Sequence, residues 1–293
     1  YWTNYPNTVN LLLNLDRNIH CIRKIHYICT QQWFLNTNIL NNTMNKRYLF
    51  LVLIFILSTF LYFSNAQTGL SKERQLALKK AELNIKELYN ELNAAQYALS
   101  FTAFRYAYIG YQTMKKQHRL NNKELFSIID FTKDCNSKRF YTIDLEKMKI
   151  VYYTYVAHGK KSGERMATSF SDAVESNKSS IGFYITGNTY NGGNGYSLML
   201  HGDEKGYNSN LAKRSVVVHA ADYANEDYIA RNGRMGRSLG CPALPENIYK
   251  QVIETIKEKT MIFAYYNDAK YLKTSKYLNV LKLIEDEPVE SVF

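Results

Sequence analysis

The chain has 293 residues, with 37 Lys or Arg against 26 Asp or Glu, so its formal net charge at pH 7 is +11. This length allows one well-packed core with a small appendage. The basic residues are scattered rather than clustered and no nucleic-acid-binding motif is present, which argues against a nucleic-acid partner. A moderately basic surface suits an anionic envelope polymer, a membrane surface or simple solubility.

Residues 44–66 have the organisation of a secretory signal peptide. A short basic stretch is followed by the apolar run Tyr48–Phe63 and by a small-residue cleavage site that ends at Ala66. We therefore expect an exported protein of the periplasm or cell envelope, and we interpret residues 1–43 as non-native upstream translation. The alternative is a genuine extension with an uncleaved hydrophobic helix, but the apolar run is shorter than the roughly 20 residues of a membrane span.

Residues 67–123 are predicted to form a helical N-terminal region. Between Ser71 and Leu99, apolar residues recur at alternating steps of three and four, which places them on one stripe of a helix. A second helix follows, with Phe104 and Tyr108 on one face. We expect a helical hairpin that packs its stripe on the next domain, and the alternative is an arm that binds a partner.

Residues 124–270 change to the pattern of a β-domain. Short segments rich in Ile, Val, Tyr, Phe and Thr alternate with polar or Gly-rich turns, as in strands. One helix, from about Pro245 to Glu258, interrupts them, and residues 271–293 are expected to form a flexible tail. Many short strands with one helix favour a mostly β sandwich or barrel. The expected strands are Leu125–Asp130, Arg139–Leu145, Lys149–Ala157, Ile181–Thr186, Tyr196–Leu200, Ser215–His219 and Thr260–Tyr265.

The strongest chemical signal in the sequence is the pair formed by Cys241 and His219. The stretch Ser238–Pro242 is a glycine-containing turn that presents the thiol, and the expected strand Ser215–His219 delivers the histidine at its end. A single Cys with a sequence-distant His is how a thiolate nucleophile and its base are usually supplied. The pair therefore predicts acyl transfer through a thioester.

Residues around the cysteine can support that chemistry. Arg234 and Arg237 add positive charge near Cys241, which favours the reactive thiolate. Gly240 lets the backbone turn tightly, so that the N–H groups near Gly240 and Cys241 can point at one spot. Such donors would stabilise the oxyanion of a tetrahedral intermediate.

Other histidines and acids are weighed against this assignment. His201 also ends a strand, so it is the alternative base. His158 either lines the site or hydrogen-bonds its own turn. Asp222 is placed to orient His219 as in a triad, although an Asp at this spacing more often caps the following turn.

The cysteine count bears on the compartment and on metal binding. Cys135 and Cys241 are interpreted as free thiols, with a disulfide between them as the alternative in an oxidising compartment. The sequence has no His-x-x-His, no Cys-x-x-Cys and no compact His/Asp cluster. We therefore expect neither a metal nor another cofactor.

The segments Val218–Ala221 and Gly236–Ala243 resemble the signature of L,D-transpeptidases, the YkuD-type murein enzymes. The resemblance runs from about Leu88 to Tyr266 and is closest to the murein L,D-transpeptidase catalytic domain proteins. It implies a YkuD-like, mostly β catalytic domain whose cysteine attacks the peptide bond after the L-centre of a diamino acid in a peptidoglycan stem. D-Ala then leaves, and the acyl group passes to a stem amine, to a D-amino acid or to water.

By this resemblance, Cys241 matches the nucleophile, His219 matches the base, and Ser238 and Gly240 match the flanking motif positions. In contrast, Leu239 stands where better-known members carry His. Ala243 stands where those members carry Arg, so a partner for the substrate carboxylate must come from elsewhere. Our candidate for this role is Arg237, and the further substrate-binding candidates are Arg234, Tyr196, His158 and His201.

The sequence as a whole predicts an exported, monomeric cysteine L,D-transpeptidase that acts on peptidoglycan stem peptides. It predicts no nucleic-acid partner and no stable membrane span after signal cleavage. One alternative is an L,D-carboxypeptidase, in which water is the acceptor. The other is a peptidoglycan-binding module that keeps the fold without turnover.

Overall fold

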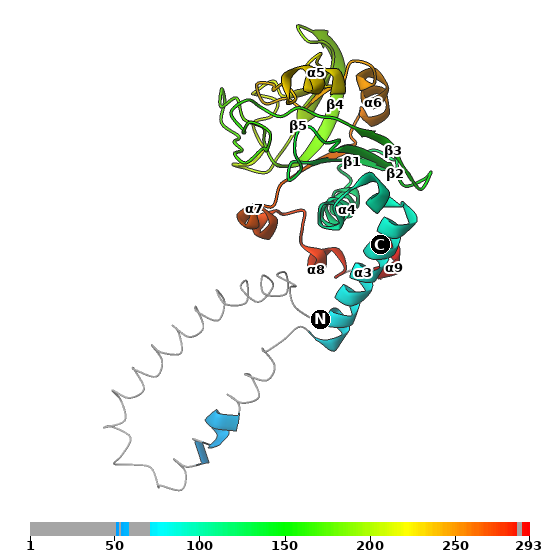
Figure 1. Cartoon of the computed structure of the whole chain (residues 1–293). Coiled ribbons are helices and arrows are strands. Elements are labelled where there is room, and N and C mark those ends of the chain that lie inside the picture. Colours follow the sequence, from blue (N-terminus) through cyan, green and yellow to red (C-terminus); the bar gives the residue numbers. More distant parts are fainter. Residues whose placement is uncertain (1–50, 53, 59–70, 286–288) are drawn as a thin grey trace, which may run out of the picture. The chain divides into compact units, whose positions relative to one another are not determined.

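The computed structural model describes residues 51–52, 54–58, 71–285 and 289–293 (Figure 1). The interpretations of residues 1–43 as upstream translation and of 44–66 as a signal peptide therefore lie outside the described residues, apart from 51–52 and 54–58. Within the described part, no helix is both long and apolar enough to cross a membrane. Residues Lys72–Phe293 form one compact unit.

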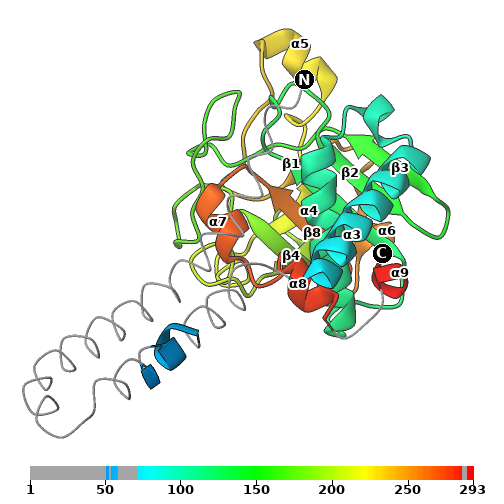
Figure 2. The same ribbon diagram turned by 90° about the horizontal axis from the view of Figure 1, so that it is seen from below.

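The unit begins with a helical hairpin, as the sequence predicts. It consists of α3 (Lys72–Glu91), the 3-10 turn η1 (Ala94–Tyr97) and α4 (Phe101–Lys116). The side chain of Ser100 caps α4 by accepting a hydrogen bond from the backbone N–H of Ala103. α3 packs on α4, which in turn lies against the sheet (Figure 2).

The described residues form an eight-stranded sheet in the order β3-β2-β1-β8-β4-β5-β6-β7. Neighbouring strands are antiparallel except for the parallel pairs β1/β8 and β6/β7. The mostly β fold preceded by helices is therefore confirmed. The strands are β1 (Leu125–Asp130), β2 (Phe140–Asp144), β3 (Lys149–Thr154), β4 (Gly182–Gly192), β5 (Gly195–His201), β6 (Val217–Ala220), β7 (Ala243–Leu244) and β8 (Met261–Tyr265).

The sheet nearly closes on itself into a barrel-like form. Beyond the end of β3, Ala157 forms an antiparallel bridge with Ala243 in β7, the strand at the other edge. The Ala157 N–H donates to the Ala243 carbonyl at 2.9 Å. This contact brings the turn after Ala157 and the Cys241 turn together.

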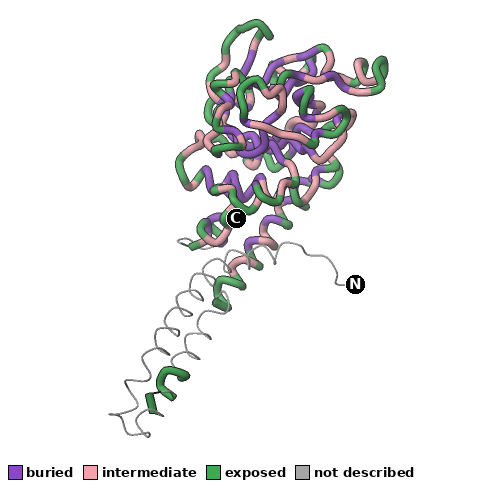
Figure 3. The backbone as a smooth tube through the Cα atoms, turned by 90° about the vertical axis from the view of Figure 1, so that its left-hand side faces the viewer, coloured by how far each residue is buried: buried purple, intermediate pink, exposed green. Residues whose placement is uncertain are grey.

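Alternate residues of the strands serve two cores, one on each face of the sheet. In β1, Phe126 and Ile128 pack with α3 and α4, whereas Leu125 and Ile129 pack with α6 (Tyr249–Ile256). This is the period of two that a strand imposes on its side chains. Buried segments accordingly gather in the strands and at the inner side of the helices, with exposed loops outside them (Figure 3).

The structure corrects the expectation of one helix in the β-domain. Helix α5 (Glu226–Asn232) lies inside the loop that joins His219 to Ser238. It is capped by Asn225 and ends at Gly233, whose φ is 74°. None of its residues is buried, so it has no apolar stripe that the sequence pattern could reveal.

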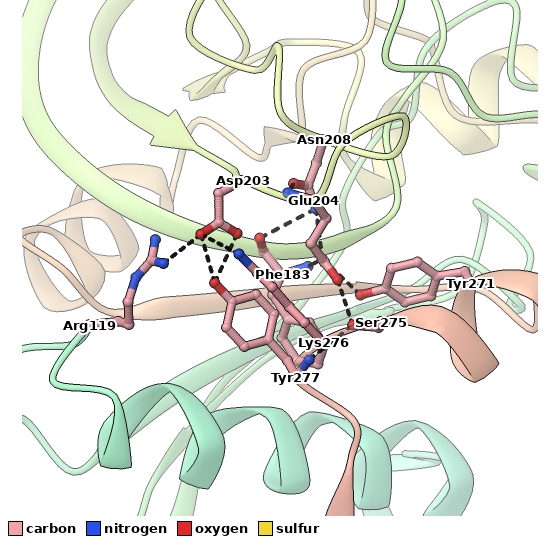
Figure 4. Close-up of polar contacts among 9 residues, drawn as sticks. All are labelled: Arg119, Phe183, Asp203, Glu204, Asn208, Tyr271, Ser275, Lys276 and Tyr277. Carbon is pink, nitrogen blue, oxygen red and sulfur yellow. Dashed lines mark hydrogen bonds and ion pairs between the residues drawn. The ribbon is translucent and has the colours of Figure 1, made fainter. Parts of the chain in front are cut away.

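The C-terminal segment forms the short helices α7 (Ala269–Thr274), α8 (Val280–Leu283) and α9 (Val289–Val292), of which α8 and α9 pack on the helical hairpin. Two acids that follow β5 hold it (Figure 4). The Tyr271 hydroxyl donates to Glu204 at 2.9 Å, and the Tyr277 hydroxyl donates to Asp203 at 2.8 Å. The flexibility of residues 271–293 stays a prediction, although Tyr271 and Tyr277 are buried.

Candidate active site

Strand β6 presents His219 on the face opposite the core. Val216 and Val218 lie in the core that contains α6, so the intervening Val217 and the following His219 point the other way. β6 is held between β5 and β7, and His219 is paired in register with Ala243. The histidine thus stands on a strand that is supported from both sides.

The turn that carries Cys241 is closed by the side chain of Ser238. Its hydroxyl donates to the Cys241 carbonyl at 2.6 Å and accepts the Gly240 N–H at 3.0 Å. Gly240 has a φ of 130°, a conformation that L side chains rarely adopt. A Cβ on Gly240 would also stand 2.8 Å from the Lys178 carbonyl oxygen, so the turn requires glycine here.

The parallel register of β6 and β7 sets the positions of the cysteine and the histidine relative to one strand pair. Cys241 precedes Ala243 by two residues and Val217 precedes His219 by two, so Cys241 lies beside Val217. The Cys241 Sγ receives a hydrogen bond from the Val217 N–H and lies 3.8 Å from the Ser215 carbonyl oxygen. The thiol and the imidazole thus come from neighbouring parts of one strand pair, and Cys241 also packs against the core that contains α6.

The imidazole of His219 is oriented by a backbone carbonyl. Its Nδ1 lies 2.7 Å from the Ala220 carbonyl oxygen. A carbonyl can only accept, so Nδ1 carries the proton and Nε2 keeps its lone pair. The sequence analysis considered Asp222 for the role of orienting His219. In the structure the Ala220 carbonyl has this role.

Burial keeps both groups neutral in the resting protein. Burial raises the pKa of the Cys241 thiol, and this effect is partly offset by the Val217 N–H and the Arg214 charge. Burial also lowers the pKa of His219, against the hydrogen bond to Ala220. At neutral pH the site therefore holds a thiol and a neutral imidazole, which is the protonation state of a nucleophile with its general base.

The backbone donors near the thiol are not equivalent. The Gly240 N–H is engaged by the Ser238 hydroxyl. The Cys241 N–H forms no hydrogen bond within the described part of the chain. Of the two donors that the sequence suggested for an oxyanion, only that of Cys241 is available in this arrangement.

Arg237 and Arg234, which the sequence places near Cys241, are both paired with Glu164. Arg237 Nη1 lies 2.7 Å from a Glu164 oxygen and also donates to the carbonyls of Lys160 and Gly163 at 3.0 Å. Arg234 Nε lies 3.3 Å from the other Glu164 oxygen. The two guanidinium groups thus share this one carboxylate, which is 71% exposed.

His158 is fully buried and both its ring nitrogens are engaged. Arg139 Nη2 lies 2.7 Å from Nδ1, and the Gly163 carbonyl oxygen lies 3.2 Å from Nε2. Burial and the neighbouring Arg139 charge lower the pKa of His158 to about 4. The structure therefore favours the interpretation that His158 hydrogen-bonds its own turn rather than a substrate.

Tyr196 and His201, the other substrate-binding candidates, lie on β5. Tyr196 precedes Leu198 by two residues in the strand, so its side chain faces the same core. Its hydroxyl donates to Glu254 on α6. It therefore stands on the face opposite His219. His201 is exposed at the end of β5, beside Gly187 of β4.

Arg214, just before β6, is a residue of this site that the sequence reasoning missed. It lies next to the Cys241 turn, yet no motif marks it, because its contacts come from residues 171–180. In the described part of the chain, Cys135 and Cys241 are free thiols. No cluster of His, Cys, Asp and Glu suited to a metal ion occurs among the described residues.

A family model, described as L,D-transpeptidase catalytic domain, matches residues 95–265 of this chain. The match covers more than half of the chain and includes α4, the sheet, His219 and Cys241. No curated protein matches the sequence significantly.

Several solved structures are similar to this one. An L,D-transpeptidase from Mycobacterium smegmatis is 11% identical with a TM-score of 0.32, and the match covers 49% of this chain and 59% of that one. The helical cell shape determining protein Pgp2 from Campylobacter jejuni is 12% identical with a TM-score of 0.33, covering 54% and 57%. An L,D-transpeptidase from Stackebrandtia nassauensis is 14% identical with a TM-score of 0.30, covering 55% and 65%. The chain thus spans less than two thirds of each relative.

Proposed function

Since the chain belongs to the L,D-transpeptidase catalytic domain family, we propose that it is an exported cysteine L,D-transpeptidase acting on peptidoglycan stem peptides. The observation that supports this proposal is that Cys241 and His219 both lie on or next to the paired strands β6 and β7. The cysteine is supplied by a turn closed by Ser238, and the histidine by a strand that β5 and β7 support. Nucleophile and base therefore come from parts of the fold that hold them in place.

In the first step, His219 Nε2 takes the proton of the Cys241 thiol, and the sulfur attacks the carbonyl carbon after the L-centre of the diamino acid. The tetrahedral oxyanion accepts a hydrogen bond from the Cys241 N–H. When the intermediate collapses, the bond to the D-Ala nitrogen breaks and the His219 imidazolium returns the proton to that nitrogen. The product is a thioester on Cys241 and free D-Ala.

In the second step, an acceptor amine attacks the thioester carbon. His219 Nε2 takes a proton from that amine and delivers it to the departing sulfur, so the free thiol is restored. With a stem amine or a D-amino acid as acceptor the reaction is transpeptidation. With water as acceptor the same steps give an L,D-carboxypeptidase.

Two substitutions relative to better-known members shape the surroundings of the thiol. Leu239, which replaces a His, is 65% exposed next to the nucleophile. Ala243, which replaces an Arg, is fully buried in β7 and carries no charge. For Arg237 to bind a substrate carboxylate, it must first release Glu164.

The test is to mix the purified protein with a disaccharide-tetrapeptide muropeptide and a D-amino acid, and to analyse the products by mass spectrometry. We expect exchange of the terminal D-Ala, or cross-linked dimers, that vanish in Cys241→Ala and persist in the matched variant Cys135→Ala. Loss of D-Ala without exchange would identify the carboxypeptidase. Retained turnover in Cys241→Ala would overturn the mechanism, and no turnover in either protein would favour the binding module.

We also propose the segment order of a signal peptide at 44–66, a helical region at 67–123 and a catalytic domain at 124–270. Expression in a bacterium followed by fractionation and intact-mass measurement tests it. The expected product starts at Gln67 and lies in the envelope fraction. A product that retains residues 44–66 would instead indicate an uncleaved anchor.

A further inference from the structure

The guanidinium of Arg214 donates four hydrogen bonds to a neighbouring loop, residues 171–180. Its Nη1 donates to the Ser171 carbonyl at 2.8 Å and to the Ser180 hydroxyl at 2.7 Å. Its Nη2 donates to the Ser176 hydroxyl at 3.2 Å and to the Lys178 carbonyl at 2.5 Å. One guanidinium therefore fastens both ends and the middle of the segment 171–180.

All of these acceptors are neutral. No carboxylate among the described residues forms an ion pair with Arg214. This distinguishes it from Arg237 and Arg234, whose charges meet Glu164. Because a guanidinium stays protonated over the whole physiological pH range, Arg214 presents a permanent positive charge that has no direct carboxylate partner among the described residues.

That charge lies against the turn that carries the nucleophile, and the residue that follows Arg214 contacts the thiol. Arg214 Nη2 is 3.1 Å from the place of a Cβ on Gly240, the residue before Cys241. The Ser215 carbonyl, one residue after Arg214, is 3.8 Å from the Cys241 Sγ. The attraction between the guanidinium and the thiolate lowers the pKa of Cys241, against the larger effect of burial.

We propose that Arg214 is the positioning residue of the nucleophile, which stabilises the Cys241 thiolate as it forms and holds the segment 171–180 against the Gly240 turn. The inference rests on the proposed function in taking Cys241 as the nucleophile. It supplies a cation to a site where Ala243 has replaced the family's arginine and Arg237 is occupied. The Arg214 side chain thus supplies a positive charge to the site and also fixes the position of the segment 171–180.

Other titratable groups near the thiol can also influence its pKa, so the test must compare variants in which these groups are unchanged. They are His219 on β6, Tyr223 in the following loop and Tyr184 on β4, since both tyrosines feel the Cys241 charge. His219 and Tyr223 show no effect of Arg214, whereas the Arg214 charge lowers the pKa of Tyr184. The control Lys213→Met leaves Arg214 and its effect on Tyr184 in place.

The experiment measures the alkylation rate of Cys241 by iodoacetamide in the full chain from pH 6 to 10. Trypsin releases residues 238–250 as one peptide that holds Cys241 as its sole cysteine, so mass spectrometry follows this thiol alone. The buried Cys135 is followed in the same digest and reports any loss of folding. The variants are Arg214→Met, Arg214→Lys and the charge-matched control Lys213→Met.

We expect Arg214→Met to slow Cys241 alkylation about tenfold at pH 7, because removal of a nearby cation raises a thiol pKa by about one unit. The rate extrapolated to full ionisation of the thiol should be unchanged. Arg214→Lys should restore most of the pH profile, and Lys213→Met should leave it in place. Cys135 should stay unreactive throughout.

The inference is overturned if the Arg214→Met profile coincides with that of the unaltered protein, or if Lys213→Met shifts it equally. It is also overturned if Arg214→Met makes Cys135 reactive while Arg214→Lys does not restore the profile, since the role would then be structural alone. The readout needs no turnover. A shifted alkylation profile in a protein without muropeptide activity would refute the proposed function and leave this inference standing. Muropeptide turnover together with an unshifted profile would support the proposed function and refute this inference.

Discussion

His158 and His219 flank the same strand and illustrate two uses of a buried histidine. Ala157, next to His158, and His219 itself both pair with Ala243. Burial lowers the pKa of both imidazoles. His158 has both nitrogens engaged, whereas His219 has a protein partner only at Nδ1 among the described residues. The free Nε2, rather than burial or the pKa direction, marks the group that can move a proton.

The largest expected effect comes from removing that free nitrogen. His219→Gln should lower kcat/KM by about 10²–10⁴-fold, the usual worth of a general base. The folded state should be retained, because β6 is supported by its neighbours. Steady-state kinetics on the muropeptide, with thermal unfolding as the folding check, measures this.

His201→Gln is the matched comparison, since His201 was the alternative base. It should leave kcat/KM within about twofold because His201 is exposed on β5. A collapse of activity in His201→Gln with normal rates in His219→Gln would reverse the assignment.

The second effect concerns stability rather than activity. His158→Ala removes the only side-chain acceptor of the buried Arg139 guanidinium among the described residues and leaves a cavity, which should lower the free energy of unfolding by about 2–4 kcal/mol. Urea denaturation measures the change. The exposed control His201→Ala should stay within about 0.5 kcal/mol. A His158→Ala protein as stable as the control would mean that Arg139 finds its partners without the imidazole.

The smallest effect is the pH dependence of stability. The pKa of His158 is about 4 in the folded protein and about 6.5 when unfolded, so the unfolded chain binds more protons between these values. Stability should therefore fall as the pH drops through this window, by about 2 kcal/mol from pH 6 to 4.5. His158→Ala should flatten this slope. An equally steep slope in the variant would place the titration on other groups, such as His219.

Local patterns predicted the strands well and the short helices poorly. β1 was predicted at the observed bounds because its apolar residues are consecutive and both faces are buried. The β4/β5 hairpin extends further than predicted, to Gly192, since its tip is polar and held by cross-strand pairing. Helix α5 escaped prediction because its stability comes from capping by Asn225 and Gly233 rather than from an apolar face.

The sequence by itself determined the fold class and the family, because these depend on local periodicity and on short motifs. The Cys241/His219 pair, which the same motifs indicate, stays a prediction. Only the tertiary structure decided which partners those residues have. Glu164 pairs with Arg237 and residues 171–180 bind Arg214 across separations of tens of residues. Such contacts are set by how the sheet closes, through the bridge between Ala157 and Ala243. No local pattern carries that information, since hydrogen-bond partners distant in the chain leave no periodic trace.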